Sequence, residues 1–124
     1  MTEPVTLSFD AFWNWLMTHP NCILRAGTPE AVIYDDDDLH WHFAAEDAET
    51  LLVQVLRGKR FVGELLIRPD QVSYVQGAPT DQENEYSFEA IAETERERYA
   101  AYFFTMTHGF DESNERTFSE GRVH

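Results

Sequence analysis

The chain contains a single cysteine and no long apolar run. Because Cys22 is the only cysteine among the 124 residues, no intramolecular disulfide and no zinc site built on several cysteines can form. No segment approaches the ~20 consecutive apolar residues that a membrane-spanning helix needs. The first residues also lack the basic and then apolar pattern of a signal peptide. We therefore expect a cytoplasmic protein that does not enter membranes.

Basic residues are scarce as well. Nine Lys and Arg stand against 23 Asp and Glu, which gives a formal net charge of −14 at pH 7. Such a charge opposes direct binding to nucleic acid or to anionic membranes and favours protein partners with a basic surface. No nucleophile motif or phosphate-binding loop is recognisable. The chain is nevertheless 43% hydrophobic and 14% aromatic, which is enough for one packed domain of this length.

The first part of the chain predicts one helix followed by strands. Ser8 is a typical N-cap residue, and the apolar residues after it recur at spacings of three and four until His19-Pro20-Asn21 ends the pattern. Short β-type runs, of which residues 39–45 alternate most clearly, then predict further elements. The expected strands cover residues 22–27, 31–34, 39–45, 60–68 and 71–76, with the last two paired as a hairpin around Pro69-Asp70.

Residues 46–57 fit two patterns, and the choice decides the topology. As a helix, they place Leu51, Leu52 and Val55 on one stripe, with acidic residues at the start. As a strand, residues 51–57 alternate, and Gly58-Lys59 closes a tight hairpin onto a strand whose Phe61, Leu65 and Ile67 face the core. We favour the strand because the segment is rich in β-branched residues and the turn is compact.

A second helix is predicted from Ser87 to about His108, with Gly109 as its terminator. The fold expected from these elements is an α+β domain over residues 1–109, in which an antiparallel meander of five or six strands carries both helices on one face. A helical 46–57 would change the order to α-β-β-β-α-β-β-α. Residues 110–124 are polar and predict a flexible tail.

Two histidines are candidate metal ligands. His40 and His42 lie two apart in a strand, so their imidazoles project from the same face. With Asp36 or Asp38 as a third ligand, they would suit a divalent transition metal such as zinc or iron. The competing interpretation is two solvated histidines on the polar face of the strand, without any cofactor.

Acidic residues form two blocks that are candidates for partner binding. The densest is the run Asp35, Asp36, Asp37 and Asp38, which we expect at a solvated hairpin tip. Along the second predicted helix, an acidic stripe would lie on the face turned to water. It consists of Glu89, Glu93 and Glu97. Both blocks would attract a basic protein surface.

Glu95 falls within the aromatic stripe of the same predicted helix, between Ile91 and Tyr99. A carboxylate in that position has to pair or be neutralised, and such groups gather at functional sites. Glu95, Tyr99 and Tyr102 are therefore a candidate ligand pocket. A structural ion pair between Glu95 and Arg25 is the alternative.

Apolar side chains that we expect outside the core are the last candidates for a binding surface. Trp15 and Phe104 fall off the buried stripes of their predicted helices. In the strand interpretation of residues 46–57, Leu52, Val62 and Leu66 would occupy the second face of the sheet. This surplus predicts self-association as a homodimer, or another protein partner.

The leading hypothesis is a small acidic, non-enzymatic module that binds a protein with a basic surface and is itself dimeric. It would act as a regulator, an antagonist or a chaperone-like partner. A small metal- or ligand-binding enzyme, which would use His40 and His42 or the pocket around Glu95, is the alternative.

Overall fold

The computed structural model describes residues 4–110, which form one α-helix, two short 3-10 turns (η) and nine strands. In chain order the elements are β1 (Val5–Leu7), α1 (Phe9–Met17), η1 (Pro20–Cys22), β2 (Ile23–Thr28), β3 (Ala31–Tyr34), β4 (Leu39–Ala45), β5 (Leu51–Arg57), β6 (Arg60–Ile67), η2 (Pro69–Gln71), β7 (Tyr74–Pro79), β8 (Tyr86–Glu93) and β9 (Arg98–Met106).

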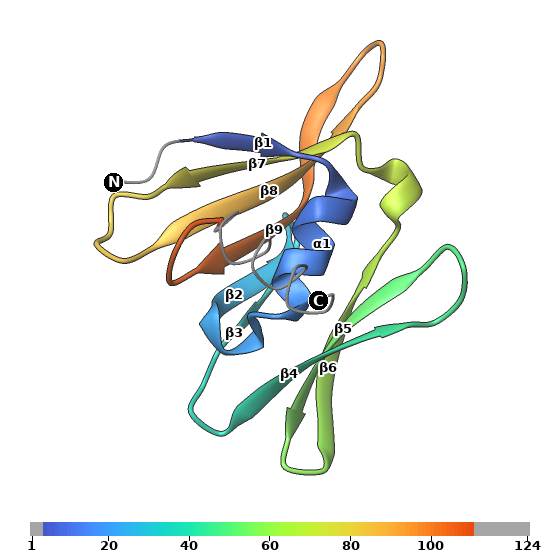
Figure 1. Ribbon diagram of the computed structural model, residues 1–124. Coiled ribbons are helices and arrows are strands. Elements are labelled where there is room, and N and C mark those ends of the chain that lie inside the picture. The colour runs from blue at the N-terminus through green and yellow to red at the C-terminus, as the bar shows by residue number, and fades with distance from the viewer. Residues whose placement is uncertain (1–3, 111–124) are drawn as a thin grey trace, which may run out of the picture.

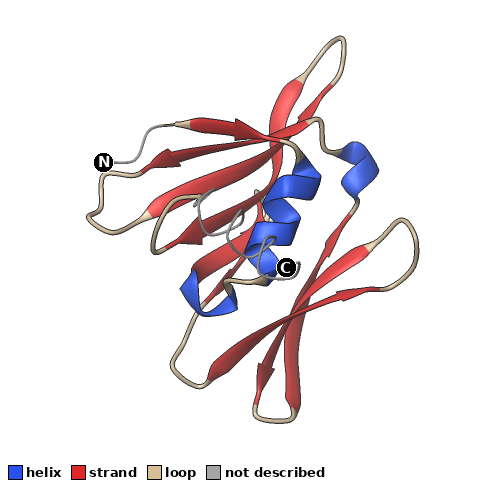
Figure 2. Ribbon diagram, viewed as in Figure 1, coloured by secondary structure: helices blue, strands red, loops and turns tan. Residues whose placement is uncertain are grey.

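The strands form two antiparallel sheets that lie on either side of α1 (Figures 1 and 2). The larger sheet has six strands in the order β1-β7-β8-β9-β2-β3, and the smaller one is a meander of β4, β5 and β6. The chain passes from the larger sheet to the smaller one between β3 and β4, and returns through η2. Each sheet therefore has one face toward the helix and one face away from it.

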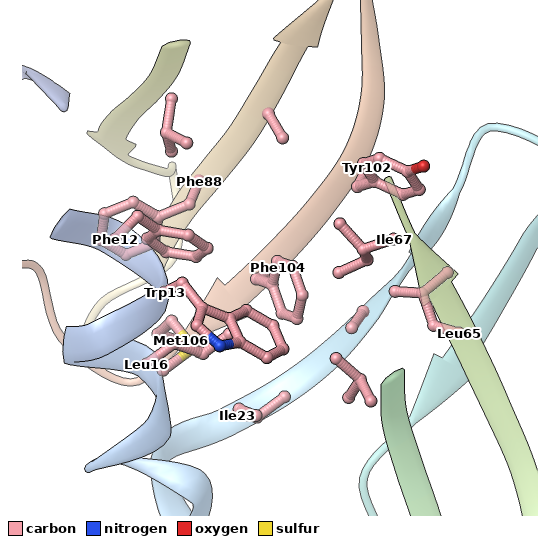
Figure 3. Packing of buried hydrophobic residues seen from close by; sticks show 14 of the residues in the cluster. Phe12, Trp13, Leu16, Ile23, Leu65, Ile67, Phe88, Tyr102, Phe104 and Met106 are labelled. Carbon is pink, nitrogen blue, oxygen red and sulfur yellow. The ribbon is translucent and has the colours of Figure 1, made fainter. Parts of the chain in front are cut away.

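Helix α1 begins where the sequence predicts, because the Ser8 hydroxyl accepts a hydrogen bond of 3.1 Å from the backbone N–H of Ala11. Its side chains join the two sheets. The ring of Phe12 packs 5.0 Å from Phe88 of β8, while Trp13 meets Phe43 of β4 edge to face at 5.5 Å. Figure 3 shows these helix side chains between β8 and β9 on one side and β6 on the other. One apolar core therefore holds all three layers together.

The predicted helix over residues 87–108 is wrong, since these residues form the β8–β9 hairpin. The middle of the predicted helix is the turn of this hairpin, in which the Thr94 side chain accepts hydrogen bonds from the N–H groups of Arg96 and Glu97. The aromatic and β-branched residues of β9 favour a pleated strand. Alternate residues of the hairpin then fill the core, namely Phe88, Ala90, Tyr102, Phe104 and Met106.

Residues 51–57 form a strand, as we favoured, and Gly58 adopts the positive φ of 63° that the two-residue turn after β5 requires. The hairpin expected between residues 60–68 and 71–76 does not exist. Strand β6 pairs with β5, whereas β7 pairs with β1 and β8. Pro69 and Asp70 lie in η2, which connects β6 of the small sheet to β7 of the large sheet. They do not form a hairpin turn between two strands of the same sheet.

The expected α+β class, with two helices over a single meander, is therefore corrected to a mostly β architecture with two sheets and one helix. The alternative order α-β-β-β-α-β-β-α is wrong for the same reason. Within residues 4–110, no helix is long and apolar enough to cross a membrane. The predicted tail covers residues 110–124. Phe110 packs against the core, and residues 111–124 lie outside the described residues.

Candidate docking face on the three-stranded sheet

The small sheet has an outer face, turned away from α1, on which several large apolar side chains are exposed although Leu52 in its centre is buried. On its inner face, residues such as Val53, Val55 and Ile67 are fully buried beneath α1. On the opposite face, Phe61, Val62 and Leu66 remain 56%, 47% and 48% exposed. The pairing of the strands arranges this outer face in three cross-strand rows: Ala44, Leu52 and Leu66; His42, Gln54 and Glu64; His40, Leu56 and Phe61.

An irregularity in β6 puts Phe61 on the outer face. The pairing shifts between Val55 and Leu56, so that Val55 lies opposite Gly63 while Leu56 lies opposite Phe61. Val62 is the extra residue of this β-bulge. Without the bulge, strict alternation would turn Phe61 inward with Leu65 and Ile67, as the sequence pattern predicts. The bulge therefore adds the largest apolar side chain to the exposed surface.

Hydrogen bonds tie the middle row together. His42 Nδ1 donates to Gln54 Oε1 at 3.2 Å, and Gln54 Nε2 donates to Glu64 Oε1 at 3.2 Å. This chain fixes the orientation of the Gln54 amide and places the Nδ1 proton of a neutral His42 ring. Apolar side chains lie on both sides of it, so the face combines one satisfied polar row with two rows that are mostly apolar.

His40 and His42 project from the same face of β4, as predicted, but the structure brings no third ligand to them. Asp36 lies 3.9 Å from the guanidinium of Arg57. Among residues 4–110, no group of three or more His, Cys, Asp or Glu side chains is arranged to hold a metal ion. The donor set here is that of a polar sheet surface rather than of a zinc or iron centre.

Residues 35–38 are exposed, but they form the connection between the sheets and not the expected hairpin tip. Asp35 Oδ1 accepts a hydrogen bond of 2.9 Å from Trp41 Nε1. The backbone of Asp36 closes a turn by accepting from the N–H of Leu39. The first half of the acidic run thus has structural contacts, and the charges of Asp37 and Asp38 extend into water.

The second acidic group lies on the β8–β9 hairpin instead of on a helix. Glu89, Glu93 and Glu97 are all exposed. Arg98 is opposite Glu93 in the pairing, yet it donates to Tyr74 Oη at 2.7 Å and to Gln76 Oε1 at 2.8 Å. The hydrogen bond with Tyr74 raises the pKa of Arg98. In Figure 1 this hairpin and the loop between β3 and β4 extend from opposite ends of the molecule, so the two acidic blocks do not form one surface.

Glu89 also lines a hollow of about 380 Å³ on the outer side of the large sheet. The walls come from β1, β7 and β8 and include Thr6, Gln76 and Ser87. These side chains are polar and uncharged apart from Glu89 itself. Pro4, Val5 and Pro79 add apolar walls, and Glu89 is the only charged residue of the lining, so the hollow lacks convergent charges.

Two predictions of exposed aromatic side chains are wrong. Trp15 and Phe104, expected at the surface, are only 2% and 1% exposed. Phe104 is buried because β9 is a strand, and Trp15 because α1 has the large sheet on one side and Phe110 packed against it. Neither residue can meet a partner directly.

The pocket expected around Glu95 does not form. Glu95 is exposed in the β8–β9 turn, and Tyr99 is 51% exposed. Tyr102 is buried in the core, where its hydroxyl accepts a hydrogen bond of 3.1 Å from the backbone N–H of Arg68. Arg25, the proposed partner of Glu95, pairs with Glu85 at 2.8 Å.

A contact that the sequence did not suggest joins Cys22 to His108. The Cys22 Sγ atom lies 3.1 Å from His108 Nε2, and His108 Nδ1 donates to the carbonyl of Gly109 at 2.9 Å. Nε2 of the neutral ring is then the acceptor for the thiol. The two residues are 86 positions apart, so only the pairing of β2 with β9 reveals the contact. One thiol with one imidazole does not by itself define a reaction.

Comparison of the chain with protein-family models, with curated proteins and with solved structures finds no match.

Proposed function

We propose that this chain is a non-enzymatic protein-binding module and that its docking surface is the outer face of the three-stranded sheet. The observation that carries the proposal is that Phe61, Val62 and Leu66 are about half exposed on the same sheet face, on the two sides of the polar row. Single exposed apolar residues are common on protein surfaces, whereas several large apolar side chains exposed on one sheet face favour an interaction site.

Acidic loops at both ends of this face select the partner. Residues 35–38 precede β4 and residues 46–49 follow it, so negative charge flanks the apolar centre. A partner that places basic side chains beside an apolar patch would gain from both contributions, because rim charges speed association and exclude wrong partners. This supports a protein partner with a basic surface and opposes nucleic acid and anionic membranes. The proposed compartment remains the cytoplasm.

A differential capture experiment tests the proposal. Tagged wild-type protein and the double variant Phe61→Ser/Leu66→Ser would be incubated with extract of the native cell, with Val32→Ser/Tyr34→Ser as the control. Val32 and Tyr34 are exposed apolar residues of the other sheet. We expect a protein that wild type and control retain in near-stoichiometric amounts and that the first variant loses. Identical retention by all three proteins would overturn the proposed docking face.

A further inference from the structure

Strand β3 is an edge of the large sheet. It pairs with β2 on one side and with no described strand on the other. Its residues are Ala31, Val32, Ile33 and Tyr34, none of which is charged or a proline. Val32 and Tyr34 are 39% and 64% exposed. The strand therefore has an open side on which another extended chain could pair.

The register identifies the backbone groups that this open side presents. The N–H of Asp35 donates to the carbonyl of Leu24 at 2.9 Å. Hydrogen-bonded and non-hydrogen-bonded pairs alternate along an antiparallel ladder, so Ile33 is bonded to β2 whereas Val32 and Tyr34 are not. The N–H and C=O groups of Val32 and Tyr34 therefore point away from β2. No other described residue forms a backbone hydrogen bond with them.

The other edge strands are less suited to such pairing. Strand β1 has only three residues, and η1 lies against β4. Strand β6 contains the β-bulge and carries the charged residues Arg60 and Glu64. Short length, a covering segment, bulges and charges are the features that keep edge strands from pairing with other chains. Strand β3 is also short, but its pairing with β2 is regular and it is entirely uncharged.

We infer that the open edge of β3 binds an extended segment of another protein, which adds to the large sheet as one further strand. Antiparallel pairing fits best, because one residue of the segment can then bond to both the N–H and the C=O of Val32, and a second residue to those of Tyr34. Every neighbouring pair in this sheet is already antiparallel. This inference goes beyond the proposed function, which concerns the other sheet.

A second copy of this chain is a poor occupant of the edge. In the antiparallel pairing that satisfies both Val32 and Tyr34, a twofold axis passes through Ile33. Glu30 of each copy then lies opposite Asp36 of the other, and like charges directly opposite each other are destabilising. The net charge of −14 adds repulsion between copies. The occupant is therefore a strand of a different protein.

Charges at the two ends of β3 give the added segment a preferred polarity. Glu30, just before the strand, is exposed and makes no ion pair with a described residue. After the strand, residues 35–38 lie at the same end as the basic β5–β6 turn, and Asp36 is 3.9 Å from Arg57. A basic residue is thus favoured opposite Glu30, which is the C-terminal end of an antiparallel segment.

Amide hydrogen exchange of the full chain, followed by NMR, tests the inference. The probe is a synthetic peptide in which Thr and Val alternate and two Lys follow, and the control peptide has the two Lys first. In the free chain the amides of Val32 and Tyr34 should exchange much faster than that of Ile33. For a Kd of about 0.5 mM, about 2 mM probe should slow both amides about fivefold. The control peptide should slow them less.

Variants identify the backbone as the binding group. Val32→Pro removes a donor from the open edge without removing a bond to β2, and edge strands tolerate proline at such positions. It should abolish the slowing at Tyr34, whereas the matched variant Val32→Thr should retain it. Glu30→Gln should reduce the preference for the probe over the control peptide, and Asp37→Asn should not. If Val32→Pro fails to fold, a probe with proline in place of its central Val makes the same test on the wild-type chain.

Several outcomes would overturn the inference. One is a free chain in which the amides of Val32 and Tyr34 exchange as slowly as that of Ile33. Another is equal protection by the proline-containing probe. Slowing that grows with protein concentration alone would make a second copy the occupant, and shift changes confined to Phe61 and Leu66 would place the probe on the small sheet. The proposed docking face is tested separately, because Phe61→Ser/Leu66→Ser leaves β3 unchanged.

Discussion

Asp35 accepts a hydrogen bond of 2.9 Å from the indole N–H of Trp41, a residue that is only 9% exposed at the inner face of β4. The first carboxylate of the acidic run is thus part of the junction between the two sheets. Its neighbours Asp37 and Asp38 extend into water, so residues with the same side chain have different roles in one run of four.

This difference predicts unequal effects of alanine substitutions. Asp35→Ala leaves the Trp41 N–H without its acceptor in a partly buried position, which should lower the free energy of unfolding by about 1–2 kcal/mol. Asp37→Ala should change it by less than about 0.5 kcal/mol. Urea unfolding of both variants checks the prediction, and equal midpoints would refute it. Asp35→Asn retains an acceptor oxygen and should lie between the two.

The hydroxyl of Tyr102 provides a second junction, because it accepts from the N–H of Arg68 at the point where β6 leaves the small sheet. Tyr102→Phe orphans this N–H and should cost about 1 kcal/mol of unfolding free energy. Tyr99→Phe, three residues away and half exposed, is the matched control and should have no measurable effect. Thermal or urea unfolding separates the two variants, and the helical interpretation of this segment predicts no such contrast.

Metal should not stabilise this protein through His40 and His42. Binding to the native state raises the melting temperature by an amount that grows with the logarithm of the ligand concentration, but among the described residues these histidines lack a third ligand. We expect the same melting curve with a chelator and with added zinc, both for wild type and for His40→Ala/His42→Ala. A zinc-dependent increase that the double variant loses would restore the metal hypothesis.

Tyr86 should make stability depend on pH in the alkaline range. Burial raises the pKa of Tyr86 above the ordinary value of 10.0. The stability associated with the protonated phenol is fully present below pH 10, and it is lost as the pH rises through the higher native pKa, because the unfolded chain releases this proton first. Tyr86→Phe should therefore flatten the decline in unfolding free energy above pH 10, whereas Tyr99→Phe should not. Parallel declines in the two variants would contradict this assignment.

The correctly predicted elements are those whose signal is local. The N-cap at Ser8, the proline that follows α1 and the strand at residues 39–45 depend on neighbours within a few positions. The turn Gly58-Lys59 likewise identified β5 as a strand. These features need no information about distant parts of the chain.

The β8–β9 hairpin shows where local pattern fails. Apolar residues such as Phe88, Tyr102 and Met106 fit one helical stripe as well as one sheet face. The turn from Thr94 to Glu97 contains no glycine or proline that would interrupt a predicted helix. Pairing of β9 with β2 and of β8 with β7 decided the outcome, because these partners are distant in sequence.

For the candidate docking face, too, some features could be predicted from local sequence and others could not. The alternation of residues 51–57 placed Leu52, Val62 and Leu66 on a second sheet face from sequence alone, and the net charge of −14 is the basis for proposing a basic partner. Only the tertiary structure decided that Phe61 joins this face, that Trp15 and Phe104 leave the surface, and that the acidic blocks separate. Contacts between distant residues determine the β-bulge, the position of α1 between two sheets and the crossover between those sheets. The periodicity of apolar residues along the chain does not encode these contacts.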